Sequence, residues 1–585
     1  MQNPGSEIYV NHALGQAHGA PDWSDEDMSD LKQEFDTALA QLTGPGAPYE
    51  LGTDELSGNF YIGAPATLRD ALDAGRAHGD REFLIYEGER RSFADLFAEA
   101  DALAAAMQAH GVEKGDRVAI AMRNYPEWMA AFLAISAIGG VIVPVNSWGQ
   151  PADIAYTVED AGAKLVFCDQ QRYDGVAEIF AQKGVQAVIA RPANADDPQG
   201  LQAFVAGHEG NSPAPVEISP DDLALIMYTS GTSGKPKGAA ISQRAICQAI
   251  FNMECCAIAA AMTNGETITA MLERGFEPTS LLAVPLFHVS GCHAQFLANL
   301  RGGRRIVMMY KWDVDTALDY VEQERITTIA AAPAMILDLL ESPRFSEADT
   351  QSLFSLGIGG AATPPKVGKL LSEKMPQNFS GTGWGMTETN AQGASFTGRA
   401  WVEKPGSSGF PHPIVQLRIC DEEGNKLSQG DTGEIWIKSV AAIREYWHRP
   451  EANAEEFRDG WFKTGDIGYI DSDGFLFLAD RAKDMIIRGG ENIYPIEIEN
   501  QLIEHPAVKE AAAIGLPHER WGEEVCVVVY TTEPLEEGEI LAFAKERLAA
   551  FKVPTKVVFA EEPLPRNATN KLLKKNIREA LLSGI

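Results

Sequence analysis

One loop, residues 228–238, constrains what this chain can fold into more than any other stretch. Its sequence, YTSGTSGKPKG, concentrates small, hydroxylated and basic residues. The residues ahead of it, 222–228, read DLALIMY and predict a short buried strand. Residues 242–250 follow closely and predict a helix that begins with Ser242 as its cap. We therefore expect the loop to join a strand to a helix.

The composition of this loop favours a phosphate ligand. Glycine lets backbone N–H groups approach an anion, Ser and Thr add hydroxyl donors, and Lys235 and Lys237 add charge. A Walker A loop needs a glycine separated by four residues from the Gly-Lys pair and Ser or Thr after it, but Thr229 and Pro236 stand there. A flexible Gly/Ser linker is the other alternative, and the apolar stretch in front argues against it. The loop therefore predicts a polyphosphate site.

Size and charge narrow the class of protein. At 585 residues the chain exceeds what one core usually supports, so two or more domains are expected. A formal net charge of −33 and a pI near 4.7 argue against nucleic acid as a partner. Seven cysteines without a C-x-x-C pair predict buried thiols. The absence of a signal sequence and the glycines that interrupt the apolar runs predict a cytoplasmic protein without an integral membrane segment.

The order of apolar segments predicts an α/β fold. Residues 1–65 form an acidic extension with one helix over 25–42, which we expect to cover surface or contact a subunit. Residues 66–480 alternate short apolar strands with helices, so a large domain of mostly parallel sheets covered by helices is expected. Residues 481–585 alternate shorter, more charged elements and predict a small α+β domain.

The loop resembles the phosphate-binding loop of the adenylate-forming superfamily, which includes acyl-CoA synthetases, luciferases and peptide-synthetase adenylation domains. Three later segments strengthen the resemblance: GTGWGMTE at 381–388, DRAKDMIIRGGENIYP at 480–495 and PLPRNATNK at 563–571. The resemblance spans residue 67 to the end of the chain. It implies that ATP and CoA are the cofactors, and that the loop holds the β- and γ-phosphates while a carboxylate attacks the α-phosphate.

The same resemblance implies a set of binding residues. Trp384 replaces the more usual Tyr and would stack on the purine, and Asp466 would accept hydrogen bonds from the ribose hydroxyls. Glu388, together with Thr232, would bind Mg²⁺. The residues assigned to the nucleotide and to CoA are Thr229, Ser230, Gly231, Thr232, Ser233, Gly234, Lys235, Gly360, Ala361, Trp384, Gly385, Thr387, Asp466, Arg481, Gly489 and Gly490.

Three residues would act in catalysis, again by resemblance. Lys571 would bridge the carboxylate and the α-phosphate during adenylation, and Asn570 stands beside it where Gly is usual. Lys483 would be the hinge of a mobile C-terminal domain, which carries Gly489 and Gly490 along the pantetheine tunnel. His288 would lie beside the acyl pocket and gate the access of CoA.

The resulting prediction is an ATP-dependent carboxylic acid–CoA ligase acting in two steps, on a medium- or long-chain or bulky apolar acid, with a homodimer as a possible assembly. One alternative is a stand-alone adenylation enzyme that loads an acyl group onto a carrier protein. An amino acid is disfavoured as substrate, because Phe287 is followed by His288 and not by the Asp of peptide synthetases. A second alternative, a non-catalytic AMP or CoA sensor, is disfavoured by the motif residues retained together, Thr387, Glu388, Asp466, Arg481 and Lys571.

Overall fold

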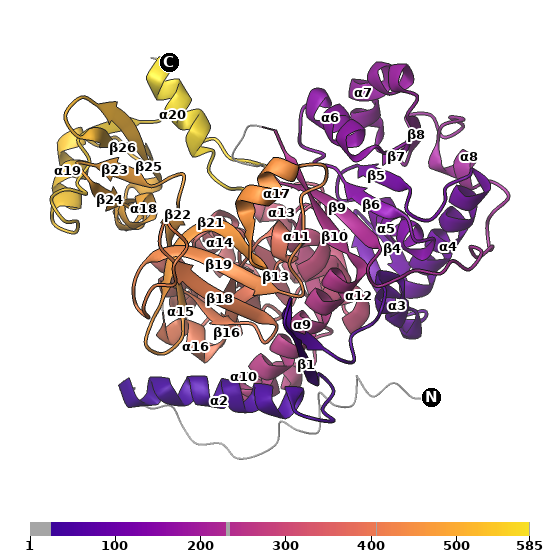
Figure 1. Ribbon diagram of the computed structural model, residues 1–585, viewed down its shortest axis with the longest axis horizontal. Coiled ribbons are helices and arrows are strands. Elements are labelled where there is room, and N and C mark those ends of the chain that lie inside the picture. The colour runs from indigo at the N-terminus through magenta and orange to yellow at the C-terminus, as the bar shows by residue number, and fades with distance from the viewer. Residues whose placement is uncertain (1–24, 230–234, 405, 584–585) are drawn as a thin grey trace.

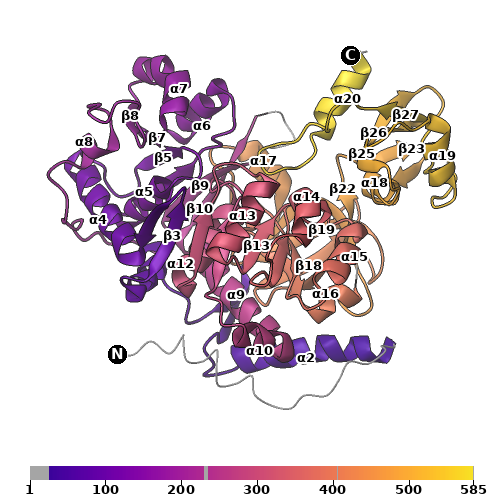
Figure 2. The same cartoon turned by 180° about the vertical axis from the view of Figure 1, so that it is seen from behind.

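The structure is a computed structural model, and it describes residues 25–229, 235–404 and 406–583. A large α/β domain forms the body of the molecule (Figure 1), and a small domain lies at one of its upper corners. The view from behind (Figure 2) shows the same two parts, with helix α2 along the opposite edge of the body. The fold is the predicted one, a large α/β domain followed by a smaller C-terminal domain.

A six-stranded sheet forms one half of the large domain. Its order is β10 (Lys237–Ser242), β9 (Leu223–Thr229), β6 (Val141–Pro144), β5 (Arg117–Ala121), β7 (Leu165–Cys168) and β8 (Gln186–Ile189). All neighbours are parallel except β10 and β9. The apolar central strands are buried, as in parallel sheets covered on both faces. The chain passes from β5 to β6 on one side and then to β7 on the other, so the strand order reverses at β5.

The phosphate loop corrects one prediction. Strand β9 is followed by a second strand, β10, which pairs antiparallel with it so that Gly238 lies opposite Tyr228. Helix α9 (Gln243–Met262) begins only after β10, with the Ser242 side chain accepting from the N–H of Ala245. The loop therefore connects two strands of a hairpin. The stretch KGAAIS did not predict a strand because Gly and Ala have low strand preference.

A fourteen-stranded sheet forms the other half. Its parallel part is β3 (Glu82–Tyr86), β12 (Arg305–Met308), β11 (Thr279–Leu282), β13 (Thr328–Ala331), β14 (Ser355–Ile358) and β15 (Gly381–Gly385), with β4 (Glu89–Ser92) antiparallel at the edge. Antiparallel strands continue it: β16 (Gly393–Thr397), β17 (Ser407–Pro411), β22 (Leu476–Arg481), β21 (Trp461–Ile470), β19 (Gly433–Ser439) and β18 (Val415–Cys420), with β20 (Phe457–Arg458) beside β21. This antiparallel region extends a domain expected to be mostly parallel.

Helices cover both sheets. The helices of the large domain include α4 (Phe93–Ala109), α5 (Pro126–Ala137), α6 (Pro151–Ala161), α7 (Gln170–Lys183), α10 (Gly265–Glu273), α13 (Val314–Glu324), α14 (Pro333–Glu341), α15 (Pro365–Lys374) and α17 (Pro450–Glu456). Helix α5 is buried along most of its length, which explains why its sequence is apolar all round. The helices thereby leave the strand ends as the places where polar loops gather.

The small domain has its own sheet and core. Its strands are β24 (Glu491–Ile493), β23 (Ile486–Arg488), β26 (Gly522–Thr531), β25 (Val508–His518) and β27 (Lys556–Phe559). Its helices are α18 (Pro495–Ile503), α19 (Glu537–Lys545) and α20 (Lys574–Ser583). A short turn, residues 482–485, links this sheet to β22, the last strand of the large sheet.

The N-terminal segment packs on the large domain. The predicted helix is present as α2 (Asp25–Thr43), followed by a hairpin of β1 (Leu51–Asp54) and β2 (Gly58–Tyr61). Leu31, Ala38 and Leu42 of α2 are buried, and the ring of Phe35 stacks on Phe410 at 5.5 Å. The segment thus contributes apolar contacts to the body.

Helix α9 is the one helix in the described part of the chain that is long and apolar enough to cross a membrane. More than half of its apolar window is buried inside the protein. Its Gln248 amide exchanges hydrogen bonds with the backbone of Tyr61, and Gln243 accepts from the N–H of Leu68. These contacts are those of a core helix of the large domain.

Candidate active site

Asp466, expected at the ribose, is held from two sides. It lies in β21, opposite Arg481 of β22. The indole N–H of Trp384 donates to its Oδ2 at 2.8 Å, and Nε of Arg481 lies 3.0 Å from its Oδ1. The carboxylate of Asp466 in turn raises the pKa of Arg481. The two predicted contacts to the ribose therefore form one oriented pair.

Trp384 departs from the open stacking face that we expected. Its side chain is only 6% exposed. A side chain at Gly393, on the neighbouring strand β16, would collide with the indole ring, so glycine makes room for it. A buried indole usually finds an acceptor for its N–H, and here the acceptor is Asp466. Gly360 and Ala361, expected at the adenine, are exposed, as is Gly385.

Lys571 reaches this pair from the small domain. Burial, with Arg481 and Lys483 nearby, lowers the pKa of Lys571 to about 8, against the opposing influence of Asp466. The neighbouring Asn570 has φ of 64°, a left-handed conformation that Asn adopts more readily than most residues. The backbone N–H of Lys571 donates to Asn567 Oδ1 at 2.9 Å. The loop thus presents the lysine between the domains.

His288 lies near Lys571 on the side of the large domain. Burial, and to a lesser degree Lys571, lowers the pKa of His288 to about 4, so its ring is neutral at physiological pH. The ring Nδ1 accepts from the N–H of Ser290, which leaves the proton on Nε2. The neutral ring therefore adds no charge beside Lys571.

Glu388, expected at Mg²⁺, ends a buried polar chain. It lies in the short 3-10 helix η4 (Thr387–Thr389), and burial raises its pKa. The Tyr446 hydroxyl is 2.9 Å from Glu388 Oε1 and 2.9 Å from Glu456 Oε2. Glu456, in α17, pairs with the ammonium of Lys237 in β10. The chain connects the exit of the phosphate loop to the carboxylate.

The two ends of the phosphate loop are fixed by side chains. Thr229 is the last residue of β9, and the exposed Lys235 has its ammonium 5.1 Å from the ring centroid of Tyr156 in α6. The Tyr228 hydroxyl donates to Asp160 Oδ2 at 2.7 Å. Five residues expected to contact phosphate lie outside the described residues: Ser230, Gly231, Thr232, Ser233 and Gly234.

Lys483 lies in the link between the two domains, and Gly489 and Gly490 lie at the next turn, within the small domain. Lys483 lies exposed in the turn between β22 and β23. Gly489 and Gly490 form the β23–β24 turn with φ of 64° and 91°, values that favour glycine. The N–H of Gly489 donates to the carbonyl of Trp521 at 2.7 Å. In this arrangement the pair faces a neighbour of its own domain, while Lys571 faces the large one.

The turn after His288 has one exposed residue. It is the π-helical segment η2 (Cys292–Leu297), in which Ala294 is exposed and the other five residues are buried. The Gln295 amide donates to the carbonyl of Ala330 at the end of β13, at 3.0 Å. Ala294 is therefore the residue of this turn that a ligand can contact from outside. Segments of π-helix often occur at functional sites.

Two family models match the chain. One, described as AMP-binding enzyme, covers residues 72–447, and the other, AMP-binding enzyme C-terminal domain, covers residues 497–571. The chain belongs to the family of AMP-binding enzymes. Segments α2, β1 and β2 of this AMP-binding enzyme precede the matched range.

Its relatives are CoA ligases. A feruloyl-CoA synthase from an Amycolatopsis species is 34% identical over 84% of this chain and 94% of its own length. The long-chain-fatty-acid–CoA ligase FadD13 from Mycobacterium tuberculosis is 34% identical over 84% and 93%. A solved structure, o-succinylbenzoate CoA synthetase (MenE) from Bacillus subtilis with ATP and magnesium ion, has a TM-score of 0.70 at 30% identity, covering 86% and 98%.

The AMP-binding enzyme is therefore an AMP-forming acid–thiol ligase that uses ATP, Mg²⁺ and CoA. The same MenE protein has also been solved with an acyl-adenylate, at TM-score 0.70, 30% identity and coverage of 88% and 99%. Adenylation followed by thioester formation is the reaction of the family. None of these relatives favours a carrier protein as the acceptor.

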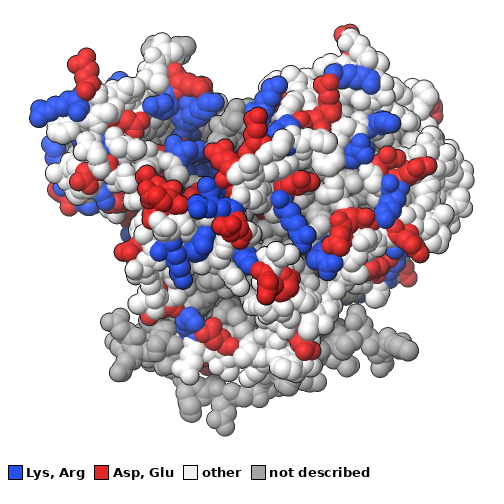
Figure 3. All heavy atoms as spheres, viewed as in Figure 1, with Lys and Arg blue, Asp and Glu red and all other residues white. Residues whose placement is uncertain are grey.

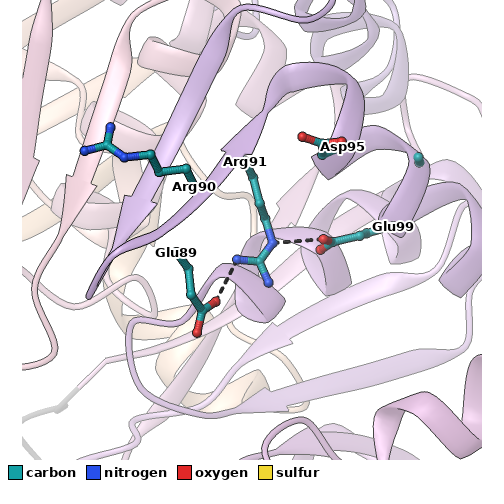
Figure 4. Close-up of a pocket in the computed structure, with 6 residues that line it drawn as sticks. Glu89, Arg90, Arg91, Asp95 and Glu99 are labelled. Atoms are coloured by element: carbon teal, nitrogen blue, oxygen red, sulfur yellow. Dashed lines mark hydrogen bonds and ion pairs between the residues drawn. The ribbon is translucent and has the colours of Figure 1, made fainter.

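A separate surface hollow of the AMP-binding enzyme lies away from these residues (Figure 4). Arg91 points into it and pairs with Glu89 at 2.9 Å and with Glu99 at 2.8 Å. Arg90 points away and pairs with Glu82 and Glu324. Because both arginines have carboxylate partners, this hollow offers no unpaired charge to a substrate.

Sequence reasoning missed Tyr446, Glu456 and Ala294 of the AMP-binding enzyme. Tyr446 and Glu456 lie in REYWHRPEANAEEF, a stretch with no local pattern that indicates a site. Their proximity to Glu388 arises only from tertiary packing. Ala294 carries no polar group, so no residue type could mark it. The signal that was available, His288 followed by small residues, located the turn but not its exposed residue.

Proposed function

We propose that this enzyme activates a bulky apolar carboxylic acid, of medium or long chain or with an alicyclic or aromatic body, and transfers it to CoA. The observation that supports the assignment of the site is the convergence of Lys571 with Arg481, Asp466 and His288, residues from both domains. The relatives act on feruloyl, long-chain fatty acyl and o-succinylbenzoyl substrates by name, which are bulky acids of different chemistry.

In the first half-reaction, an oxygen of the acid attacks the α-phosphorus of ATP and pyrophosphate leaves. Asp466 holds the ribose hydroxyls, and Trp384 and Arg481 fix the direction of that carboxylate. Lys571 offers a cation to the carboxylate and α-phosphate oxygens as negative charge shifts to the leaving group. The groups are oriented before substrate binds, so little reorganisation is needed.

Magnesium would supply charge neutralisation on the phosphates of ATP. Glu388 is the residue that would hold it, because Mg²⁺ prefers one or two carboxylates completed by phosphates and water. No group of three or more His, Cys, Asp or Glu suited to a metal occurs in the described ranges, which agrees with a cation held largely by substrate. Tyr446 fixes one oxygen of Glu388 and leaves the other side of the carboxylate for this role. Thr232, the second expected ligand, lies outside the described residues.

In the second half-reaction, the thiol of CoA attacks the acyl carbon and AMP leaves. The small domain would rotate about Lys483 so that Gly489 and Gly490 replace Lys571 at the site. Two observations support this. The glycine pair lies at an exposed turn beside Trp521 of its own domain, whereas Lys571 lies near Asp466 of the large domain, and the link of residues 482–485 is short.

The acyl group would bind beside the exposed Ala294. Small residues lie close by in sequence and register, because Gln295 donates to the carbonyl of Ala330 in β13, and Gly357, Gly359 and Gly360 lie on or after the neighbouring strand β14. Pockets lined by small apolar residues admit bulky apolar ligands and give a small polar acid little to bind. Acetate is therefore a poor candidate.

A panel of acids tests this assignment. Pyrophosphate exchange is measured with acetate, octanoate, a long-chain acid and an aromatic acid such as ferulate, for the wild type and for Ala294→Trp. The tryptophan should lower kcat/KM for the preferred bulky acid by at least about tenfold, because a filled pocket excludes large side groups. Ala181→Trp, on the exposed surface of α7, is the control. Equal losses in both variants, or acetate as the best substrate, would reject the bulky acid.

A further inference from the structure

A second group of polar residues gathers where the six-stranded sheet reverses its strand order. Arg123 follows β5, Trp148 follows β6, and Asp169 and Arg172 follow β7. Tyr310, which follows β12 of the other sheet, completes the group. The crevice at the carboxyl ends of parallel strands, beside such a reversal, is where open α/β sheets bind ligands. We call these five residues the Arg123 cluster.

Arg123 has a guanidinium group without a hydrogen-bond partner on two of its nitrogens. The residue is only 7% exposed. Its Nε and Nη1 are fully covered and bond to no atom in the described part of the protein. Trp148 lies over the group, with Cζ 3.0 Å from its ring centroid, and Tyr310 lies at 4.8 Å. Burial and Arg172 lower the pKa of Arg123.

The nearby carboxylate is already engaged. Asp169 Oδ2 accepts the backbone N–H of Arg123 at 3.0 Å, and Oδ1 lies 3.2 Å from Nη1 of Arg172. Arg172 also donates from Nε to the carbonyl of Ser147 at 2.8 Å. Arg123 and Arg172 together hold the pKa of Tyr310 below its usual value, although burial acts to raise it. The Asp169 carboxylate thus pairs with the guanidinium of Arg172 and takes only a backbone N–H from Arg123, so the cluster carries an excess positive charge.

The excess positive charge of the Arg123 cluster contrasts with the negative net charge of the whole protein. On the face shown in Figure 3, blue and red side chains are interspersed over both domains. The formal charge of the whole chain is −33, so a polyanionic substrate needs a local cationic site to approach. A buried cation without a partner is costly unless a ligand or a ring compensates it. The planar guanidinium fork fits phosphate oxygens, and the adjacent indole can stack on a base.

The Arg123 cluster is tied to the reaction site through one residue. The Asn124 side chain donates to the carbonyl of Val284 at 3.0 Å and accepts from the N–H of Leu286 at 2.9 Å. Leu286 lies two residues before His288, the residue proposed to gate CoA. The cluster therefore lies on the side of the large domain from which a thiol substrate would reach the acyl group. Trp148 is 39% exposed and covers the guanidinium, so a ligand that displaces the indole reaches Arg123.

We propose that the Arg123 cluster binds a phosphate-bearing nucleotide, with Arg123 and Arg172 as its phosphate ligands and Trp148 as its stacking surface. Two sources share this chemistry, the nucleotide end of CoA and a free phosphorylated nucleotide. The first source rests on the proposed CoA half-reaction and deepens it; the second does not depend on it.

Calorimetry with adenosine 3′,5′-bisphosphate, the nucleotide end of CoA without its thiol arm, tests the site directly. Arg123→Gln should weaken binding by at least about tenfold, because two charge-assisted contacts are lost. Arg90→Gln is the matched control, since the Arg90 guanidinium is paired with Glu82 and Glu324 at the surface. Because this readout needs no turnover, it stands even if the enzyme uses a different thiol acceptor.

Kinetics then separate the two sources. Thioester formation from supplied acyl-adenylate is measured with CoA and with 3′-dephospho-CoA. A KM rise of about tenfold for CoA in Arg123→Gln, with a smaller rise for 3′-dephospho-CoA, assigns the site to CoA. Lost binding of the bisphosphate with an unchanged KM for CoA assigns it to a free nucleotide.

The proposal is overturned if Arg123→Gln is folded and matches Arg90→Gln in both assays, because Arg123 would then be a structural cation held by two rings. If Arg123→Gln does not fold, Arg172→Gln replaces it, with a loss of at least about threefold expected in bisphosphate binding. Unchanged binding in a folded Arg172→Gln would equally reject the site. A wild type that exchanges pyrophosphate but makes no CoA thioester would instead reject the proposed function.

Discussion

The two groups of buried cations in this enzyme differ in how their charge is compensated. Between the domains, Arg481 faces Asp466 at 3.0 Å, and Asp466 also accepts the indole N–H of Trp384. In the Arg123 cluster, the carboxylate of Asp169 pairs with the guanidinium of Arg172, and two guanidinium nitrogens of Arg123 have no hydrogen-bond partner among the described residues. The first group is oriented by the protein itself. In the second group, two guanidinium donors remain without an acceptor among the described residues.

The difference teaches what each group is suited to do. A catalytic centre gains most from charges that are already oriented, because no reorganisation is needed as the reaction proceeds. A binding site for an anion gains from an excess of donors that the ligand completes. Variants that remove one member of each group should therefore fail in different assays, and the predictions below use that contrast.

The largest effect is expected for Lys571→Ala. Pyrophosphate exchange should fall by about 10²-fold or more, because an oriented cation is lost from the developing charge. The conversion of supplied acyl-adenylate and CoA to thioester should stay within a few-fold of wild type. Lys545→Ala, exposed on α19 of the same domain, is the control. Equal loss of both half-reactions would show that Lys571 serves one fixed site and that the small domain does not exchange faces.

A smaller effect is expected for Trp384→Phe, which keeps an aromatic ring and removes the N–H. Asp466 would lose one donor, and a hydrogen bond to a charged group is worth about 1.5–3 kcal/mol. The KM for ATP should rise by about tenfold or more, with little change in the KM for CoA. In an Asp466→Ala background the same substitution should have little further effect, because its partner is gone.

Trp312→Phe is the control for that variant, since the buried indole N–H of Trp312 has no partner in the part of the chain that the structure describes. If Trp384→Phe raises the KM for ATP equally with and without Asp466, then Trp384 contributes by stacking and not through the carboxylate. That outcome would remove the oriented pair from the comparison between the two groups.

These residues also show how far sequence reasoning reaches. The motif around Trp384 was found because its spacing is local, and Asp466 and Arg481 were found in the same way. Their mutual contact depends on the register of β21 against β22, which no local pattern specifies. The strand β10 was missed because KGAAIS contains only one β-branched residue, Ile241, and no aromatic residue to favour a strand. Arg123 was not singled out, because an arginine after a strand is ordinary until its burial and missing partners are known.

Some strands of the fold could likewise be predicted from the sequence, and others could not. Buried parallel strands such as β6 and β7 are continuous apolar runs, and the alternation of such runs with helices indicated a mostly parallel sheet. The antiparallel strands β16 and β17 read GASFT and SSGFP, where small and polar residues give no clear alternation. They form because neighbouring strands supply hydrogen bonds and Phe396 and Phe410 pack on Phe475. Because β16 and β17 depend on tertiary contacts, the local sequence could not predict them.

A still smaller effect is expected for Tyr446→Phe, which breaks the hydrogen-bonded connection between Glu388 and Glu456. The hydroxyl no longer separates the two carboxylates, and one hydrogen bond of about 1 kcal/mol is lost from Glu388. The Mg²⁺ concentration needed for half-maximal exchange should rise by about fivefold, with the KM for the acid unchanged. Tyr530→Phe, in β26 of the small domain, is the control. An unchanged Mg²⁺ requirement would limit Tyr446 to a packing role.

The smallest effect concerns pH and tests whether the two groups of cations are independent. The pKa of Lys571 is lowered to about 8 by burial and by the nearby cations Arg481 and Lys483. Below that pH the ammonium is protonated and can neutralise charge, and above it the proton is lost. The kcat/KM for ATP in pyrophosphate exchange, which reports on the free enzyme, should therefore fall as the pH rises through about 8.

Removing one neighbouring cation in Lys483→Ala should raise the pKa of Lys571 and move this basic limb to higher pH by less than about one unit. Arg123→Gln should leave the limb in place, because the charges that chiefly shift the pKa of Lys571 are Arg481, Asp466, Lys483 and Asp484. A limb that moves in Arg123→Gln, or one that stays in Lys483→Ala, would show that the lysine responds to a different set of charges and that the two groups act as one.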